Sequence, residues 1–99
     1  MSIEHWRSDI DAIDSELLGL LNKRASLAVK VGQSKRLTGV ALYDPLREEE
    51  VIERARKANP GPLDDQSIVE LFGCIIRESR RIEACAMERG EPGKMSDTL

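Results

Sequence analysis

The sequence predicts an all-α fold of three helices per chain, with a long N-terminal helix and two chains intertwined as a helical homodimer. Between Trp6 and about Arg36, apolar residues recur at alternating steps of three and four residues, which is the period of a helix surface. Two later segments repeat this period after aspartates suited to cap a helix. No segment has the alternation of a strand, and aromatic residues make up only 3% of the chain, too few for the core of a sheet protein.

The first helix is predicted from Ser2, a suitable N-cap, to about Arg36, with Thr38-Gly39 as the stop signal. Its seam places one arginine among apolar residues: Trp6, Ile10, Ile13, Leu17, Leu20, Arg24, Leu27 and Val31. A helix of roughly 33 residues is about 50 Å long, whereas a compact chain of this size has a radius of gyration of about 13 Å. Because so small a body cannot bury the whole seam, we expect the long helices of two chains to pair.

The second helix is predicted from Asp44-Pro45 to about Lys57, because Asp is a good N-cap and Pro is favoured at the first helical position. After the loop ANPGPLD, a third helix is predicted from Asp64 or Asp65 to about Arg89. Its seam consists of Ile68, Phe72, Ile75, Ser79, Ile82 and Ala86. Residues 91–99 are polar with Gly and Pro, so we expect a disordered tail after a single domain of residues 1–90.

Composition excludes several classes of function. The net charge of -3 argues against a nucleic-acid partner, and no apolar run is long enough to cross a membrane. The N-terminus has no signal-peptide pattern. Cys74 and Cys85 would lie roughly 16 Å apart on one helix, too far for a disulfide, which predicts reduced thiols and a cytoplasmic location. One His and two separated Cys predict no metal site.

Arg24 breaks the apolar seam, and a buried charge needs a partner or an anionic ligand. Lys35 lies three turns further on nearly the same side of the helix. Arg7 lies about 25 Å away along the axis, so it can approach Arg24 only from the other chain of an antiparallel pair.

Arg47 and Glu48 add a cation and an anion near the start of the second helix, after Asp44. On the third helix Ser79 breaks the seam, and Glu83, four residues later, shares its face. A pocket of cations, a hydroxyl and carboxylates suits a small anion with more than one carboxylate, which Arg binds through its bidentate fork.

Simpler interpretations remain open at this point. Arg24 can pair with Glu16 or another acid across a coiled-coil seam, and Asp44 can be only an N-cap. Arg7 and Arg47 can be surface residues, and the Ser79 hydroxyl can bond to its own helix. Glu83 can pair with Arg80 or Lys57 on a solvated face. The pattern alone predicts a small helical dimer and does not decide whether it holds an anion site.

Three stretches together resemble a known family: RSDIDAIDSELLGLLNKRASLAVKVGQSK (residues 7–35), YDPLREEEVIER (43–54) and LFGCIIRESRRIE (71–83). They are similar to the all-helical (AroQ-class) chorismate mutases over about residues 4–88. The resemblance implies three helices per chain in an intertwined dimer, and a free-standing enzyme that converts chorismate to prephenate in phenylalanine and tyrosine biosynthesis. It implies no cofactor.

The resemblance also assigns roles to residues of this chain. Arg7 of the partner chain would grip a substrate carboxylate, and Arg24 and Arg47 would hold the carboxylates within the chain. Lys35 would bind a carboxylate and the ether oxygen, and Ser79 would contact the ring carboxylate. Glu48, helped by the backbone of Asp44, would accept a hydrogen bond from the ring hydroxyl. The apolar walls would be Val31, Val51 and Ile76.

Catalysis of this rearrangement needs orientation and donors at the ether oxygen, where negative charge grows. Lys35 would be one donor and Glu83 the other. Because an ionised carboxylate cannot donate, Glu83 would have to be protonated. Two positions differ from members of the family: position 83, here Glu, is Gln in many bacterial members and Glu in fungal ones, and Arg80 stands where an apolar wall residue is usual.

Two other functions fit the same residues. An isochorismate-pyruvate lyase or an aminodeoxychorismate mutase would share the carboxylate clamps on the same scaffold. A non-catalytic helical dimerisation module would use Arg24 only to fix the register of its helices.

Overall fold

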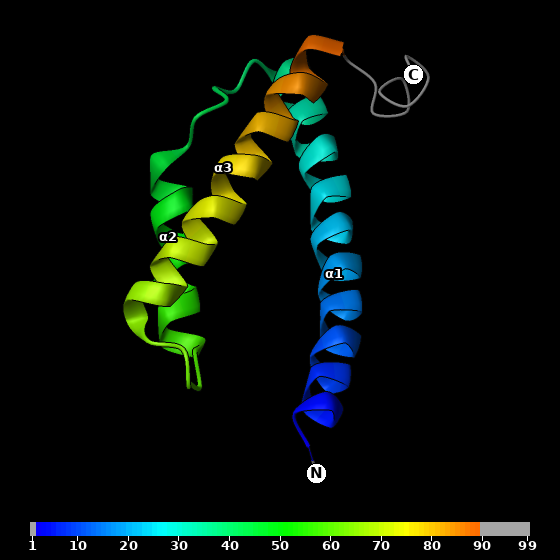
Figure 1. The fold of residues 1–99 in the computed structure, drawn as a ribbon. Helices are drawn as coiled ribbons and strands as arrows, with labels where there is room; N and C mark the ends of the chain where they lie inside the picture. Colours follow the sequence, from blue (N-terminus) through cyan, green and yellow to red (C-terminus); the bar gives the residue numbers. More distant parts are fainter. Residues whose placement is uncertain (1, 90–99) are drawn as a thin grey trace.

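The computed structural model describes residues 2–89, which form three helices (Figure 1): α1 (Ile3–Thr38), α2 (Pro45–Ala58) and α3 (Asp65–Arg89). No strand occurs among these residues. The predicted all-α class and the bounds of all three helices are therefore confirmed. The predicted tail, residues 91–99, lies outside the described residues.

Each helix begins or ends at a residue whose chemistry predicts it. The Ser2 hydroxyl accepts a hydrogen bond from the amide of His5, and α1 is capped after Thr38 by Gly39, which has a left-handed φ of 74°. Asp44 caps α2 in the same way through the amide of Arg47. Asp64 rather than Asp65 caps α3, because the Asp64 carboxylate accepts from the amide of Ser67 at 2.8 Å. Hydrogen bonds from the backbone and the side chain of Ser67 hold the pKa of Asp64 below its ordinary value.

The C-terminal half of α1 packs against α3, and α2 packs against the other side of α3 (Figure 1). The α1–α3 contact is close because small residues meet there: Ala28 and Gly32 are buried on α1, and Ala86 is fully buried on α3. A Cβ atom at Gly32 would lie 2.5 Å from the carbonyl oxygen of Glu83. Glycine at this position therefore sets how closely the two helices approach.

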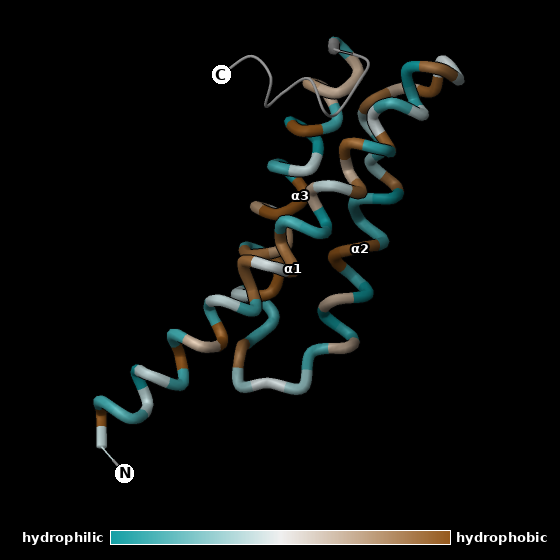
Figure 2. The backbone as a smooth tube through the Cα atoms, turned by 90° about the vertical axis from the view of Figure 1, so that its right-hand side faces the viewer, coloured by the Kyte–Doolittle hydropathy of each residue, from teal (hydrophilic) through white to brown (hydrophobic). Residues whose placement is uncertain are grey.

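The predicted seam of α1 does not enter the core of its own chain. Its five N-terminal members, Trp6, Ile10, Ile13, Leu17 and Leu20, keep 49–63% of their surface exposed. Figure 2 shows this half of α1 extending away from the other helices, with apolar positions spaced along it.

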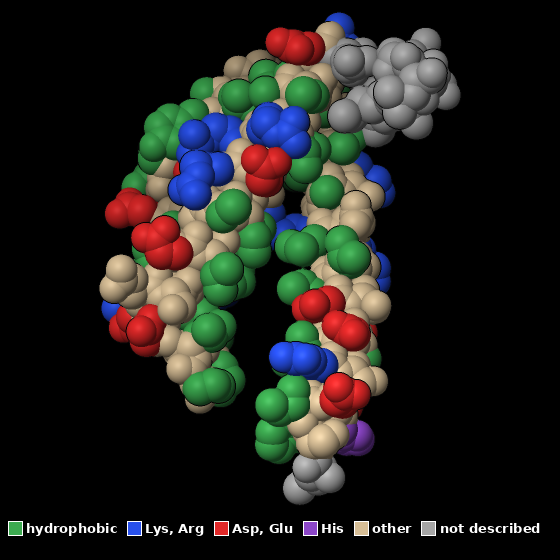
Figure 3. All heavy atoms as spheres, in the orientation of Figure 1, with side chains coloured by type: hydrophobic (Ala, Val, Ile, Leu, Met, Phe, Trp, Pro, Cys, Tyr) green, Lys and Arg blue, Asp and Glu red, His purple; other side chains and the backbone are tan. Residues whose placement is uncertain are grey.

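The described chain is correspondingly extended. Its radius of gyration is 16.6 Å, and its longest dimension is 53 Å, whereas a compact chain of this length would have a radius near about 13 Å. In Figure 3 hydrophobic side chains border both sides of an open gap between α1 and the α2–α3 pair. None of the described helices is long and apolar enough to cross a membrane.

Candidate active site

A cavity of about 360 Å³ lies where the three helices meet. It is lined by Arg24, Leu27, Ala28, Val31, Lys35, Leu42, Asp44, Arg47, Glu48, Val51, Ile76, Ser79, Arg80 and Glu83. Every residue predicted to bind substrate or form the apolar walls is in this set, except Arg7. Residues from α1, the α1–α2 linker, α2 and α3 therefore converge on one pocket.

Arg24 contacts α3 across this pocket. Its guanidinium donates a hydrogen bond to the hydroxyl of Ser79. Of the ion pairs found among residues 2–89, none includes Arg24. Within its own chain Arg24 is thus held by a neutral partner, which leaves its positive charge available to an anion.

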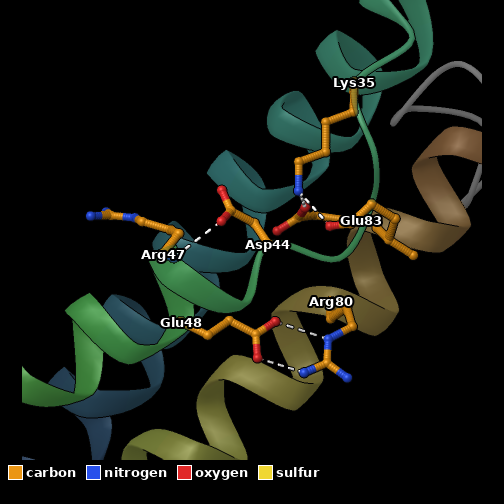
Figure 4. Close-up of polar contacts among 7 residues, drawn as sticks. Lys35, Asp44, Arg47, Glu48, Arg80 and Glu83 are labelled. Carbon is orange, nitrogen blue, oxygen red and sulfur yellow. Dashed lines mark hydrogen bonds and ion pairs between the residues drawn. The ribbon is translucent and has the colours of Figure 1, made fainter.

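Lys35 joins the linker and α3. Its Nζ atom lies 2.8 Å from Oε1 of Glu83 and 2.6 Å from the carbonyl oxygen of Leu42, and the side chains of Lys35 and Glu83 are only 15% and 16% exposed. Figure 4 shows the two side chains pointing toward each other. In this arrangement Glu83 accepts a hydrogen bond, whereas the role expected for it in catalysis is that of a donor.

Glu48 is held by Arg80, a residue to which the sequence assigned no role in binding. Two parallel hydrogen bonds, of 3.0 Å and 2.6 Å, join the guanidinium of Arg80 to the two carboxylate oxygens of Glu48 (Figure 4). The guanidinium also lies 4.8 Å from the ring centroid of Tyr43. The hydrogen bonds with Glu48 raise the pKa of Arg80 above its ordinary value, and an arginine is charged at neutral pH without any such shift.

These two ion pairs, Lys35–Glu83 and Arg80–Glu48, correct one interpretation of the sequence, the one that concerns the partner of Glu83. Glu83 does not pair with Arg80 or Lys57 on a solvated face, because its partner is Lys35 inside the pocket. Arg80 directly follows the predicted site residue Ser79 in the chain. That Arg80 reaches Glu48 depends on how α3 is rotated against α2, which only the structure shows.

Asp44 and Arg47 lie at the rim. Asp44 is the N-cap of α2, as the simpler interpretation predicts, and it also lines the pocket. The guanidinium of Arg47 contacts Glu50, and both side chains are more than half exposed. Figure 4 shows this guanidinium turned away from Lys35 and Glu83. Because exposed ion pairs contribute only about 0–1 kcal/mol, Arg47 can exchange Glu50 for a ligand at little cost.

Arg7 is exposed near the N-terminus of α1 and does not line the pocket of its own chain. The two arginines, Arg7 and Arg24, are separated by nearly five turns of continuous helix, about 25 Å along the axis.

The pocket combines positive charge with apolar walls. Its cations are Arg24, Lys35, Arg47 and Arg80, and its carboxylates are Asp44, Glu48 and Glu83, so cations are in excess by one. Val31, Val51 and Ile76 line it as predicted, and Ile76 is only 7% exposed. Residues 2–89 contain no cluster of three side chains suited to hold a metal ion. The arrangement suits a small anion with an apolar body.

Comparison with known proteins identifies relatives of the chain. The family described as chorismate mutase type II matches residues 6–84. The chain is 44% identical to the bifunctional chorismate mutase/prephenate dehydratase of Neisseria gonorrhoeae over 78% of its own length. It is 34% identical to the 4-amino-4-deoxychorismate mutase of Streptomyces venezuelae over 88% of its length and 85% of that protein. The chain spans about a fifth of the length of the bifunctional relatives.

Solved structures with the same fold include two of similar size. The chorismate mutase of Thermus thermophilus (form II) has a TM-score of 0.81 at 35% identity, covering 83% of this chain and 93% of that one. The chorismate mutase of Helicobacter pylori in complex with prephenate has a TM-score of 0.79 at 29% identity, covering 87% of this chain and 93% of that one.

Proposed function

The chain belongs to the type II chorismate mutase family, and from this premise we propose that it catalyses the rearrangement of chorismate to prephenate. The proposed enzyme works as a homodimer in the cytoplasm, needs no cofactor and serves phenylalanine and tyrosine biosynthesis. The observation that carries the proposal is the meeting of Arg24, Lys35 and Glu83 in one pocket with apolar walls. A structural relative with prephenate in its complex supports it.

Chorismate carries two carboxylates and reacts within itself: one C–O bond breaks while one C–C bond forms. The protein therefore has to hold the enolpyruvyl arm over the ring, which cations at both carboxylates do by orientation. In our proposal Arg24 and Arg47 bind the carboxylates within the chain, and Ser79, already joined to Arg24, contacts the ring carboxylate.

The second task is to stabilise the negative charge that grows on the ether oxygen as the C–O bond stretches. Donors aimed at this atom stabilise the transition state more than the ground state. Lys35 and Glu83 are adjacent and largely shielded from water, so an ether oxygen placed between them meets two donors once Glu83 carries a proton. Glu48 accepts a hydrogen bond from the ring hydroxyl, with the backbone of Asp44 beside it.

In the proposed dimer, the partner chain supplies Arg7, the one predicted substrate-binding residue that does not line the pocket of its own chain. The exposed apolar stripe of α1 gives two chains a surface to bury against each other, and Arg7 lies at its beginning. In an antiparallel arrangement the N-terminal half of α1 of one chain reaches the pocket of the other, where Arg7 adds a cation for the substrate.

The test is the disappearance of chorismate, with product identification, for the wild type, Arg24→Ala and Arg77→Ala. We expect prephenate from the wild type and from Arg77→Ala, whose exposed arginine on α3 does not line the pocket. Arg24→Ala should lose about thirtyfold or more in kcat/KM, because truncating one partner of a desolvated charge contact costs roughly 2–5 kcal/mol.

The other candidate functions give different results in the same assay. Product from isochorismate or from 4-amino-4-deoxychorismate, with no turnover of chorismate, would assign the pocket to one of these related enzymes. No turnover of any of the three, with Arg24→Leu more stable than the wild type, would instead indicate a helical dimerisation module.

A further inference from the structure

Arg80 occupies an unusual place for an arginine, because it forms part of the pocket wall while binding both oxygens of a pocket carboxylate. Its side chain is 37% exposed and that of Glu48 is 23% exposed. The Tyr43 ring lies against the guanidinium, which limits the directions it can take. Glu48 is therefore fixed in orientation, and its negative charge is balanced by a cation at 2.6 Å.

We propose that Arg80 determines substrate specificity: by balancing the charge of Glu48, it makes the pocket prefer a neutral hydroxyl to an ammonium group at the ring position that Glu48 contacts. The inference rests on the proposed function, in which Glu48 accepts from the ring hydroxyl of the substrate. Arg80 acts through Glu48, so it is a positioning and specificity residue rather than a catalytic one.

The physical basis is the difference between a free and a paired carboxylate. A carboxylate has about four acceptor positions, and Arg80 uses one on each oxygen of Glu48, so a hydroxyl can still donate to it. An ammonium group at the same place would also meet the positive guanidinium of Arg80, and like charges brought together in a partly dry site repel. A free Glu48 would instead attract the ammonium group more strongly than the hydroxyl.

A natural pair of substrates differs in this one group. 4-Amino-4-deoxychorismate appears in the name of the Streptomyces venezuelae relative. It carries an amine where chorismate carries the ring hydroxyl. An aliphatic amine is protonated at neutral pH. Both molecules keep the two carboxylates and the enolpyruvyl ether, so the carboxylate clamps at Arg24 and Lys35 act on both alike.

The experiment compares kcat/KM for these two substrates in the wild type, Arg80→Met, Arg80→Lys and the control Arg77→Met. We expect the wild type and Arg77→Met to prefer chorismate, since Arg77 is exposed on the same helix outside the pocket. Arg80→Met should shift the ratio of the two kcat/KM values toward the amino substrate by about tenfold or more. Arg80→Lys keeps the charge without the bidentate contact, so it should lower both values while holding the ratio within about threefold of the wild type.

Three results would overturn the inference. One is an Arg80→Met variant that loses the same factor on both substrates, and another is a ratio that shifts equally in Arg80→Met and Arg80→Lys. Either result, with a wild type active on chorismate, leaves the proposed function standing and removes the role of Arg80. A wild type that converts neither substrate overturns the proposed function and this inference together.

Discussion

Arg24, Lys35 and Arg80 differ in what balances their charges inside the pocket. Arg80 is paired with Glu48 and Lys35 with Glu83, whereas Arg24 is held by the hydroxyl of Ser79. A dianionic ligand therefore finds one cation already oriented without a competing carboxylate. Lys35, by contrast, has to be shared between the ligand and Glu83.

Glu83 should make activity depend on pH. If it donates to the ether oxygen, only its protonated form is active, so kcat/KM of the wild type should fall as pH rises, by up to about a hundredfold for the loss of one such donor. In Glu83→Gln the amide donates at every pH, and the profile should be flat. Turnover of chorismate measured from about pH 5 to about pH 9 in both proteins tests this.

Glu78→Gln is the matched control for this profile. Glu78 lies on the same helix but is exposed and paired with Arg81, so removing its charge should leave the pH dependence of the wild type unchanged. Equally flat profiles for the wild type and Glu83→Gln would show that Glu83 does not act as a proton donor in the reaction.

At the scale of the helices, the position of the Lys35–Glu83 pair depends on how α1 crosses α3. Gly32 lies one turn before Lys35 and directly against the backbone of Glu83. The distance between α1 and α3 at Gly32 therefore also sets the distance between the side chains of Lys35 and Glu83. A β-carbon there would lie 2.9 Å from Cα of Glu83 and 3.0 Å from Cβ of Ala86, and backbone atoms cannot turn aside as a flexible side chain does.

Gly32→Ala should therefore push α1 and α3 apart. We expect the free energy of unfolding to fall by about 1–3 kcal/mol, the usual effect of overpacking, although alanine is the better helix former. Chorismate turnover should fall as well, because the separation of Lys35 and Glu83 changes. Denaturant unfolding and kcat/KM, measured on the same preparation, give the two values.

Gly73→Ala serves as the comparison for this substitution. Its new Cβ would lie 3.4 Å from the mobile end of the Arg77 side chain, so this helical glycine can gain up to about 1 kcal/mol of helix propensity. A Gly32→Ala protein as stable and as active as Gly73→Ala would mean that the two helices do not depend on this close approach.

The helices were predictable from sequence because their signals are local. Ser2, Asp44 and Asp64 are caps, and each marks its helix within a residue of the observed start. Burial was less predictable, since the apolar period of α1 shows a stripe but not which chain covers it. In its own chain α1 buries Ala28 and Gly32, two small residues outside the predicted seam.

The pocket residues were predictable for a different reason. Arg24 and Lys35 were found first from the helical pattern, as a charge in the apolar seam and a cation on the same side of the helix. The resemblance then assigned roles to them and to Glu48 and Glu83, because a substrate that needs fixed charges restricts the residues that hold it. The pairing of Glu48 with Arg80 was not found, because it depends on the rotation of α3 against α2, which no local signal in the sequence records.

At the scale of the whole molecule, the single chain leaves two features incomplete. The N-terminal half of α1 exposes its apolar stripe, and Arg7 lies about 25 Å from Arg24 along the same helix. A two-fold dimer would resolve both, because each pocket would then take Arg24 from one chain and Arg7 from the other. Homodimers of Arg7→Ala and of Arg24→Ala should each lose turnover, since every pocket lacks one arginine.

Mixing these two variants tests whether the pocket is shared. Random pairing makes half of the dimers mixed, and one of the two pockets in a mixed dimer keeps both arginines, so about a quarter of the wild-type activity per chain should return. Arg24→Ala mixed with Lys35→Ala is the matched control, because both residues belong to the pocket of one chain and no mixed dimer then has an intact pocket. Activity that returns in both mixtures, or in neither although mixed dimers form, would contradict the donation of Arg7 across the dimer.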